Sequence, residues 1–115
     1  IDNFQLEVDR KYQKADIFIN NSGVYHLQKS LSKDGYEMHF ATNTLGNYYL
    51  AKKIIYDLKE NAKMIFVSSL AANFYKINFS DFQSLHTKNK MKVYGISKRI
   101  MMAVLLCLLM VIRFI

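Results

Sequence analysis

The sequence predicts an α/β protein whose strands belong to a parallel sheet, and three observations support this class. Two short apolar runs, residues 16–19 and 64–67, each lead directly into a polar cluster. Continuous apolar runs of this length are typical of strands buried on both faces of a parallel sheet. A long segment with helical periodicity separates the two runs, and a second long apolar segment begins at Val93. The order strand, helix, strand, helix is that of α/β folds.

The first half of the chain is predicted to hold a surface helix, a strand, a loop and a long helix. Residues 3–14 are mainly polar, and we expect the end of a surface helix that leads into the first strand. A loop is expected over residues 20–33. Asp34 can then cap a helix that residues 59–61 close. The apolar residues of this helix follow one another at helical spacing, which places them on one face: Leu45, Tyr48, Ala51, Ile55 and Leu58.

The second half of the chain contains a long connection and a long helix. Residues 74–92 predict an irregular connection, with a single helical turn at residues 79–82. From Val93 the chain is predicted to be helical to its end. Residues 100–112 are uncharged and would span about 20 Å as a helix, which is shorter than the ~30 Å hydrocarbon core of a membrane.

Three interpretations of this apolar segment stay open. The first, which we favour, is a helix buried on several sides, in a core or against another subunit. The second is a membrane-spanning segment, because Arg99 and Arg113 bracket the run. The third is an incorrect reading frame or exon boundary after Arg99, because the segment has almost no polar face.

Length and composition set further bounds. A chain of 115 residues forms at most one domain, and a hydrophobic share of 51% argues against general disorder. Two parallel strands cannot cover their own faces, so we expect the chain, which starts with Ile1, to be the middle of a larger domain. None of the four glycines stands in a G-x-G relation, so the chain lacks a phosphate-cradling turn.

The charge is unevenly distributed along the chain. The net charge is +7, all nine acidic residues lie within residues 1–81, and residues 82–115 hold six basic residues. A basic segment can attract the phosphates of a cofactor, a nucleic acid or a membrane surface. The interpretation we favour is a solvated basic loop. Because only Tyr94 interleaves these lysines and no nucleic-acid motif is present, we expect no nucleic-acid partner.

The cysteine and the histidines do not predict a metal site. The single Cys107 lies inside an apolar run, can form no disulfide framework and is predicted to be a buried, inert thiol. The three histidines, His26, His39 and His86, are scattered and are predicted to lie on the surface or in loops. We therefore predict no metal centre.

The pattern Tyr-x-x-x-Lys occurs four times, so the spacing alone is uninformative. The pairs are Tyr25–Lys29, Tyr48–Lys52, Tyr49–Lys53 and Tyr94–Lys98. Spacing of four places both side chains on one helical face. Only Tyr94 has further context, because it lies at the start of a predicted helix and Ser97 precedes its lysine. A predicted strand that ends in Ser68 and Ser69 also lies upstream.

This combination resembles the short-chain dehydrogenase/reductase family. After the first strand the chain has Asn20, Asn21, Ser22 and Gly23, which correspond to the family's Asn-Asn-Ala-Gly turn. The helix between the strands carries Asn43 in Asn-Thr-Leu-Gly, which matches the family's Asn-x-Leu-Gly. The resemblance implies a Rossmann-type doubly wound parallel sheet, of which this chain would hold about two strands and two to three helices.

Three further stretches are similar to the retinol-dehydrogenase-like branch of that family: residues 34–37, 40–43 and 76–84. The resemblance extends over residues 15–99. It implies that residues 1–115 are a partial domain, without the glycine-rich turn that lies upstream in the family and without the substrate-binding part that lies downstream. We expect such a segment to be inactive by itself and poorly stable.

The resemblance also implies a catalytic set. Tyr94 would exchange a proton with the substrate oxygen as the hydride moves. A free tyrosine has a pKa of about 10, and the ammonium of Lys98 would lower it. The Ser69 hydroxyl would hold the substrate oxygen near the phenol. Asn43 would hold a water in a proton relay that ends at Lys98.

The implied function is NAD(P)-dependent carbonyl reduction or alcohol oxidation on a retinoid, a steroid or another lipophilic small molecule. The cofactor would be NADP or NAD, bound by Asn20, Asn21, Ser22, Gly23, Tyr94 and Lys98. The alternative is a non-catalytic, truncated relative that acts as a dimerisation or membrane-associated module. The long helices over residues 34–60 and 93–112 would then form a homodimer interface. The location, cytoplasmic or membrane-associated, stays open.

Overall fold

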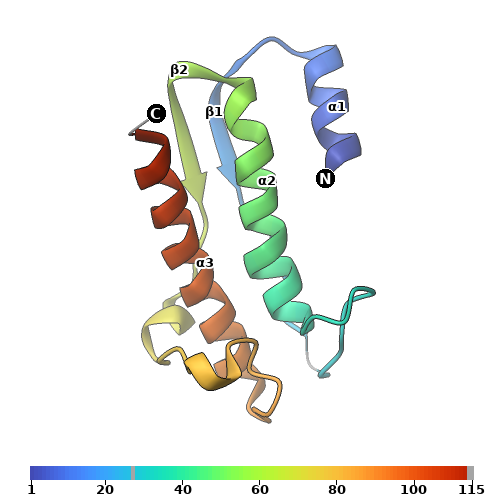
Figure 1. Cartoon of the computed structure of the whole chain (residues 1–115), viewed down its shortest axis with the longest axis vertical. Coiled ribbons are helices and arrows are strands. Elements are labelled where there is room, and N and C mark those ends of the chain that lie inside the picture. The colour runs from blue at the N-terminus through green and yellow to red at the C-terminus, as the bar shows by residue number, and fades with distance from the viewer. Residues whose placement is uncertain (27, 114–115) are drawn as a thin grey trace.

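The computed structural model describes residues 1–26 and 28–113, with side chains up to Met110. Two parallel strands, β1 (Ala15–Asn20) and β2 (Leu58–Phe66), form a two-stranded sheet, and helices lie beside it (Figure 1). The predicted α/β class with two parallel strands is therefore confirmed.

The strands pair in a regular way toward their carboxyl ends. Phe18 pairs with Met64, and Asn20 pairs with Phe66. The N–H of Val67 then donates to the carbonyl of Asn20 at 2.9 Å, which extends the pairing beyond β2. The two polar clusters that follow the strands consequently lie side by side at one edge of the sheet.

The second strand begins earlier than predicted. The prediction that residues 59–61 close the preceding helix is wrong, because β2 begins at Leu58. Leu58 is buried, has an extended backbone and pairs with Ala15 of β1. Pairing with a distant strand, which local sequence does not reveal, thus outweighs the helical periodicity at this point.

A continuous helical segment precedes β2 and runs from Met38 to Asp57. It consists of a π-helix, η1 (Phe40–Gly46), the α-helix α2 (Asn47–Ile54) and a short 3-10 turn, η2 (Ile55–Asp57). The helix predicted between the strands is confirmed, and the π-helical part of it was not foreseen.

The start of this segment is capped by a different residue from the one predicted. Asp34 lies in a turn four residues before Met38, so its predicted role as the cap is wrong. The Glu37 carboxylate instead accepts the N–H of Phe40 at 2.8 Å. A carboxylate at this place also suits the partial positive charge of a helix N-terminus.

Helix α3 (Lys90–Arg113) begins three residues earlier than predicted, so Tyr94 lies in its second turn. The side chain of Asn89 caps the helix by accepting the N–H of Lys92 at 3.0 Å. The connection before it contains two 3-10 turns, η3 (Leu70–Asn73) and η4 (Phe79–Asp81). The second of these confirms the predicted helical turn.

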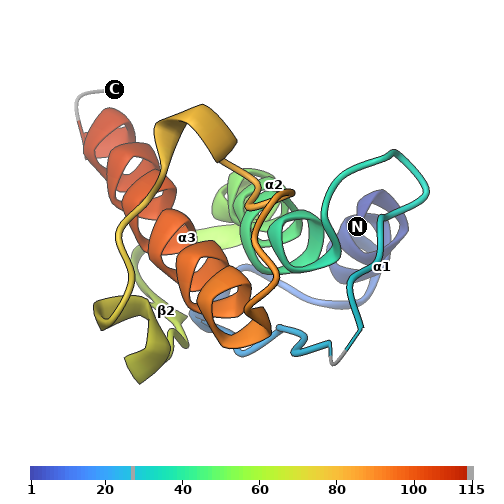
Figure 2. The same ribbon diagram turned by 90° about the horizontal axis from the view of Figure 1, so that it is seen from below.

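The core lies between α2, α3 and one face of the sheet, and both views place the two helices side by side (Figures 1 and 2). Two clusters of buried side chains form it: Phe40, Ile96 and Ile100 in one, and Ala51, Met101 and Leu105 in the other. Met64 and Phe66 of β2 pack against the second cluster. Residues of α3 enter both clusters, so the N-terminal half of this helix is anchored in the core.

No described helix covers the opposite face of the sheet. Its apolar side chains are exposed: Ile17 (56%), Ile19 (61%), Ile65 (45%) and Val67 (42%). The covered face agrees with the predicted burial, and the exposed face agrees with the expectation that two parallel strands cannot cover their own faces, because the described helices pack on one side only.

The first helix, α1 (Asp2–Lys11), agrees with the surface helix predicted before the first strand. Asp2 binds it to α2, because its carboxylate accepts the Tyr49 hydroxyl at 2.8 Å and pairs with Lys53 at 3.3 Å. Both contacts are exposed, and surface ion pairs contribute little to stability.

The outer half of α3 is less buried than its start. Cys107 is exposed, so its predicted burial is wrong. The stretch Lys90–Met110 is long and apolar enough to cross a membrane by length and composition alone, a property that it shares with core helices of soluble proteins. Within residues 100–110 only Ile100, Met101 and Leu105 are buried, and most of the others are exposed. The favoured interpretation of a helix buried on several sides therefore holds for one side of this stretch and is wrong for the rest of it.

Candidate active site

The turn after β1 joins the end of the sheet to α2. Asn20 is 4% exposed, and its Oδ1 accepts the N–H of Ser22 at 3.1 Å and the hydroxyl of Ser22 at 2.6 Å. The carbonyl of Ser22 in turn accepts the side-chain amide of Asn47 at 3.3 Å. Asn21 is exposed. Asn20 is thus the structural residue of the Asn-Asn-Ser-Gly turn, and Asn21 faces solvent.

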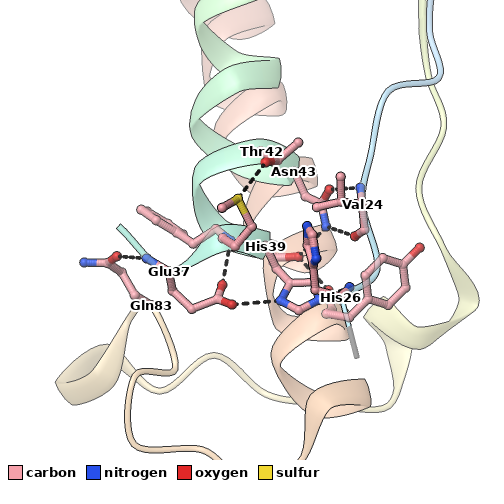
Figure 3. Close-up of polar contacts among 11 residues, drawn as sticks. Val24, His26, Glu37, His39, Thr42, Asn43 and Gln83 are labelled. Carbon is pink, nitrogen blue, oxygen red and sulfur yellow. Dashed lines mark hydrogen bonds and ion pairs between the residues drawn. The ribbon is translucent and has the colours of Figure 1, made fainter. Parts of the chain in front are cut away.

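Asn43 connects three segments of the chain. Its side chain has no exposed surface, and its Oδ1 accepts the N–H of Val24 at 2.8 Å. Its Nδ2 donates to the carbonyl of Val24 at 3.0 Å and to the hydroxyl of Ser97 at 3.1 Å. Figure 3 shows the two contacts to Val24. Asn43 therefore holds the loop after β1 and helix α3 against η1.

Lys98 lies between the ends of the two strands. Its side chain is 5% exposed, and its Nζ donates to the carbonyl of Val67 at 3.2 Å. Burial lowers the pKa of Lys98 below its ordinary value. A Cβ on Gly23 would lie 2.8 Å from this Nζ and 3.2 Å from the Oδ1 of Asn43. Glycine therefore leaves the ammonium in its present place, whereas a side chain at this position would make it shift.

The backbone of α3 near Tyr94 is fixed by polar contacts. The hydroxyl of Ser97 donates to the carbonyl of Tyr94 at 2.7 Å. The carbonyl of Ser97 accepts the hydroxyl of Thr44 at 2.8 Å. Ser97, which the sequence singled out only as part of a motif, therefore joins Asn43 to the turn of α3 that carries Tyr94.

Ser69 follows β2 and begins the 3-10 turn η3. Its Oγ accepts the N–H of Ala71 at 3.2 Å, which leaves the hydroxyl proton free to donate. Gly95 allows α3 to approach this segment, because a Cβ there would lie 2.5 Å from the carbonyl oxygen of Ala71. The turn of α3 beside Tyr94 is therefore packed directly against the segment that Ser69 starts.

The ring of Tyr94 contacts two other rings. Tyr25 meets it edge to face, with ring centroids 5.2 Å apart and an interplanar angle of 83°. His39 lies at a centroid distance of 6.2 Å and an angle of 69°. Edge-to-face pairs of this kind are favourable beyond their buried area.

The prediction that all three histidines lie on the surface or in loops is wrong for His39. This residue is 2% exposed and lies at the start of the helical segment. Its Nδ1 contacts the Oε1 of Glu37 at 2.8 Å, and its Nε2 accepts the N–H of His26 at 2.9 Å (Figure 3). Burial raises the pKa of Glu37, but hydrogen bonds from His39 and from the N–H of Phe40 outweigh it, so the net pKa is lowered.

A signal in the sequence could have identified this residue. His39, Asn43 and Asn47 are spaced by four, which places them on one face of a helix. Three buried polar side chains on one helical face need hydrogen-bond partners, and backbone groups of the loop after β1 are those partners. Glu37 and Gln83 had no comparable signal, because their contacts depend on how distant loops fold.

The structure brings most of the predicted site residues together. A Cβ on Gly23 would lie within 3.2 Å of both Lys98 and Asn43, and Ser97 joins Asn43 to the backbone of Tyr94. Ser69 lies on the neighbouring segment, where its hydroxyl oxygen accepts the N–H of Ala71. The arrangement offers a phenol, a buried ammonium, a carboxamide and a hydroxyl near the carboxyl ends of two parallel strands, where ligands of open α/β sheets bind.

Comparisons with known proteins agree with this arrangement. No protein-family model matches the chain. Retinol dehydrogenase 14 of Mus musculus is 35% identical over 97 residues, which cover 83% of this chain and 29% of that protein. Dehydrogenase/reductase SDR family member 12 of Homo sapiens is 35% identical over 102 residues, which cover 86% of this chain and 31% of that protein.

A solved structure has a similar fold over most of this chain. An uncharacterised protein from Mycobacterium paratuberculosis superposes with a TM-score of 0.67 and 28% sequence identity, over 82% of this chain and 34% of that one. The chain therefore belongs to the short-chain dehydrogenase/reductase family. Within that family it is similar to the retinol-dehydrogenase-like members, as the sequence predicts. It spans less than a third of the length of the curated relatives it matches.

Proposed function

We propose that the protein that contains this sequence is an oxidoreductase that interconverts a carbonyl group and an alcohol, with NADP or NAD as the hydride carrier. The observation that carries this proposal is the position of Lys98. It is buried at the strand ends, one helical turn from Tyr94, beside a glycine that leaves it room.

The acid–base step of this reaction is assigned to Tyr94. A phenol is a weak acid near neutral pH, and an ammonium one helical turn away favours its charged form. Lys98 would also be able to pass a proton on, because burial brings its pKa closer to the neutral range. Asn43 would fix the neighbouring loop, and Ser69 would donate its hydroxyl proton to the substrate oxygen.

The donors present suit the ribose end of a nicotinamide cofactor. The ammonium of Lys98 has three N–H donors, and the carbonyl of Val67 takes one. The remaining donors would bind ribose hydroxyls, while the turn from Asn20 to Gly23 would border the cofactor. The cofactor, when bound, would supply or accept the hydride.

We propose a lipophilic alcohol or carbonyl compound as the substrate class. The support is the similarity to proteins named retinol dehydrogenases. An apolar groove of about 470 Å³ is lined by Tyr48, Phe79 and Val104 among others, and none of the candidate site residues lines it. The substrate pocket is therefore assigned to the strand ends beside Tyr94 and not to this groove.

The direct test is Tyr94→Phe in the full-length protein, assayed with NADPH and NADH on lipophilic carbonyl compounds. We expect the variant to bind cofactor and to lose nearly all turnover, because the proton donor is removed. Tyr48→Phe is the matched control, since Tyr48 has the same spacing to a lysine but lies outside the site. Unchanged turnover in Tyr94→Phe would contradict the proposal.

A second candidate is a non-catalytic module that dimerises or associates with membranes through its long helices. The apolar groove between η4 and α3 favours it, because Phe79 and Phe82 there are exposed to solvent. Sedimentation of the full-length protein and flotation with lipid vesicles test this candidate. A monomer that does not float, together with turnover that depends on Tyr94, would exclude it.

A further inference from the structure

Three aromatic rings meet beside the candidate proton donor. The ring centroids of Tyr25, His39 and Tyr94 are 5.2 to 6.2 Å apart, so each ring contacts the other two. Tyr25 comes from the loop after β1, His39 from the start of the helical segment, and Tyr94 from α3. The orientation of the Tyr94 phenol therefore depends on two segments besides its own helix.

Tyr25 is held on both sides along its backbone. The N–H and the carbonyl of Val24 both bond to the side chain of Asn43, at 2.8 and 3.0 Å. The N–H of His26 bonds to the Nε2 of His39 at 2.9 Å. Because His39 and Asn43 lie one helical turn apart, a single helical face presents Tyr25 to Tyr94.

The hydrogen bonds assign one form of the His39 ring. The Nε2 accepts from a backbone N–H, so it carries no proton. The Nδ1 must then hold the proton and donate it to Glu37, which is 1% exposed. The Oε2 of Glu37 accepts the N–H of Phe40. The backbone N–H of Glu37 donates to the side-chain oxygen of Gln83 at 3.0 Å. The pair is thereby anchored on both sides (Figure 3).

We propose that Glu37 and His39 form a positioning pair for Tyr94. Glu37 orients the imidazole, the imidazole holds the N–H of His26, and the loop fixed in this way packs Tyr25 against the phenol. The pair acts through Tyr94 and does not touch the substrate. This inference rests on the proposed function, because positioning matters for turnover only if Tyr94 transfers the proton.

Two substitutions of His39 separate positioning from stability. In His39→Gln the side-chain oxygen replaces the Nε2 acceptor for His26, but the Oε1 of Glu37 loses its side-chain donor and only the N–H of Phe40 still donates to the carboxylate. In His39→Asn the amide replaces the Nδ1 donor to Glu37, but the N–H of His26 loses its acceptor. We expect His39→Asn to be the more stable variant, because a buried carboxylate that loses a donor costs more than a neutral N–H that loses an acceptor. We expect it also to be the less active one.

The kinetic measurement uses the full-length protein. In His39→Asn we expect kcat to fall by about tenfold or more while KM changes less than about twofold, since only the orientation of the proton donor is affected. His39→Gln should keep more of the wild-type kcat despite its lower stability. His86→Gln is the control and should match the wild type, because the side chain of His86 is exposed and its backbone N–H bonds to Asp81. Activity that follows stability across the two His39 variants would overturn the proposal.

A second readout does not need activity. The ring protons of Tyr94 in tyrosine-labelled protein carry shifts from both neighbouring rings. We expect Glu37→Gln, which keeps both neighbouring rings, to move these shifts toward solvent-exposed values. Gln83→Ala, which removes the acceptor of the Glu37 N–H and leaves no buried charge behind, should move them in the same direction if the first variant fails to fold. Unmoved shifts would overturn the positioning role even in an inactive protein. If the wild-type protein shows no turnover while the variants still move the Tyr94 shifts, the proposed function alone is contradicted.

Discussion

The two faces of the β1–β2 sheet differ in burial although both carry large apolar side chains. On the covered face, Met64 and Phe66 pack beneath Ala51 and Met101. On the other face, Ile19 is 61% exposed. The strands of a doubly wound sheet are apolar on both faces because helices cover both. Apolar side chains on both faces of the strands are typical of a sheet with a helix layer on each face. The described residues form one such layer, and the stability of this structure depends on the packing of that layer against the sheet.

The largest loss of stability should come from removing a buried side chain on the covered side of the sheet. Ile100 is 1% exposed between α3 and η1. We expect Ile100→Ala to lower the free energy of unfolding by about 2–5 kcal/mol, because it leaves a cavity in a packed cluster. Urea denaturation of variant and wild type measures the difference. A loss below about 1 kcal/mol would show that this side is not the core.

The second largest loss of stability should come from removing the buried carboxylate of Glu37. We expect Glu37→Gln to lower the free energy of unfolding by about 1–3 kcal/mol near neutral pH, because the charged hydrogen bonds to His39 and Phe40 are lost. The folded-state pKa of Glu37 is lowered from 4.5, so its stabilisation is present above that value and is lost as the pH falls through the folded pKa. The two proteins should therefore converge in acid, and a constant gap would contradict the assignment.

Removing the charge of Lys98 should raise the free energy of unfolding, whereas removing that of Glu37 lowers it. Burial lowers its folded-state pKa from 10.5, so its charge opposes folding at neutral pH, and stability should rise as the pH rises toward that value. We expect Lys98→Met to raise the free energy of unfolding by about 1 kcal/mol near neutral pH while turnover is lost. Thermal denaturation at matched pH measures the gain. A clear loss of stability would show that the ammonium is structural.

The smallest effect should come from the uncovered face. We expect Ile19→Thr to change the free energy of unfolding by less than about 0.5 kcal/mol, because the side chain is already largely in water. Denaturation under the same conditions as for Ile100→Ala provides the comparison. A loss as large as that of Ile100→Ala would break the contrast, because it would mean that this face is covered in solution.

The pattern of apolar runs was sufficient to predict the parallel strands and the helices between and after them. It failed where a distant partner decides the local structure. Leu58 has helical spacing from Ala51 and Ile55, yet it pairs with Ala15 and starts a strand. The exposure of Cys107 was missed for a related reason, since apolar neighbours in sequence do not show which side of a helix is covered.

The candidate site was predictable in its residue types and less so in its supports. Tyr94 and Lys98 could be chosen because their context distinguishes them from the other Tyr-x-x-x-Lys pairs. Asn43 and Gly23 could be chosen because their motifs resemble those of the short-chain dehydrogenase/reductase family. The partners of Asn43 are backbone atoms of Val24, and backbone atoms leave no mark in a sequence. Their contribution became visible only when the loop was placed against the helix.

The π-helix at Phe40–Gly46 makes the site sensitive to the number of residues as well as to their chemistry. Each residue turns an α-helix by about 100°, so a change of one residue in this turn rotates everything on one side of it by roughly that angle. Asn43 lies inside the widened turn and Asn47 directly after it. Deleting a single residue such as Ala41 would leave every proposed chemical group in the protein. It would nevertheless rotate His39 relative to Asn43, so that the loop carrying Tyr25 could no longer reach both.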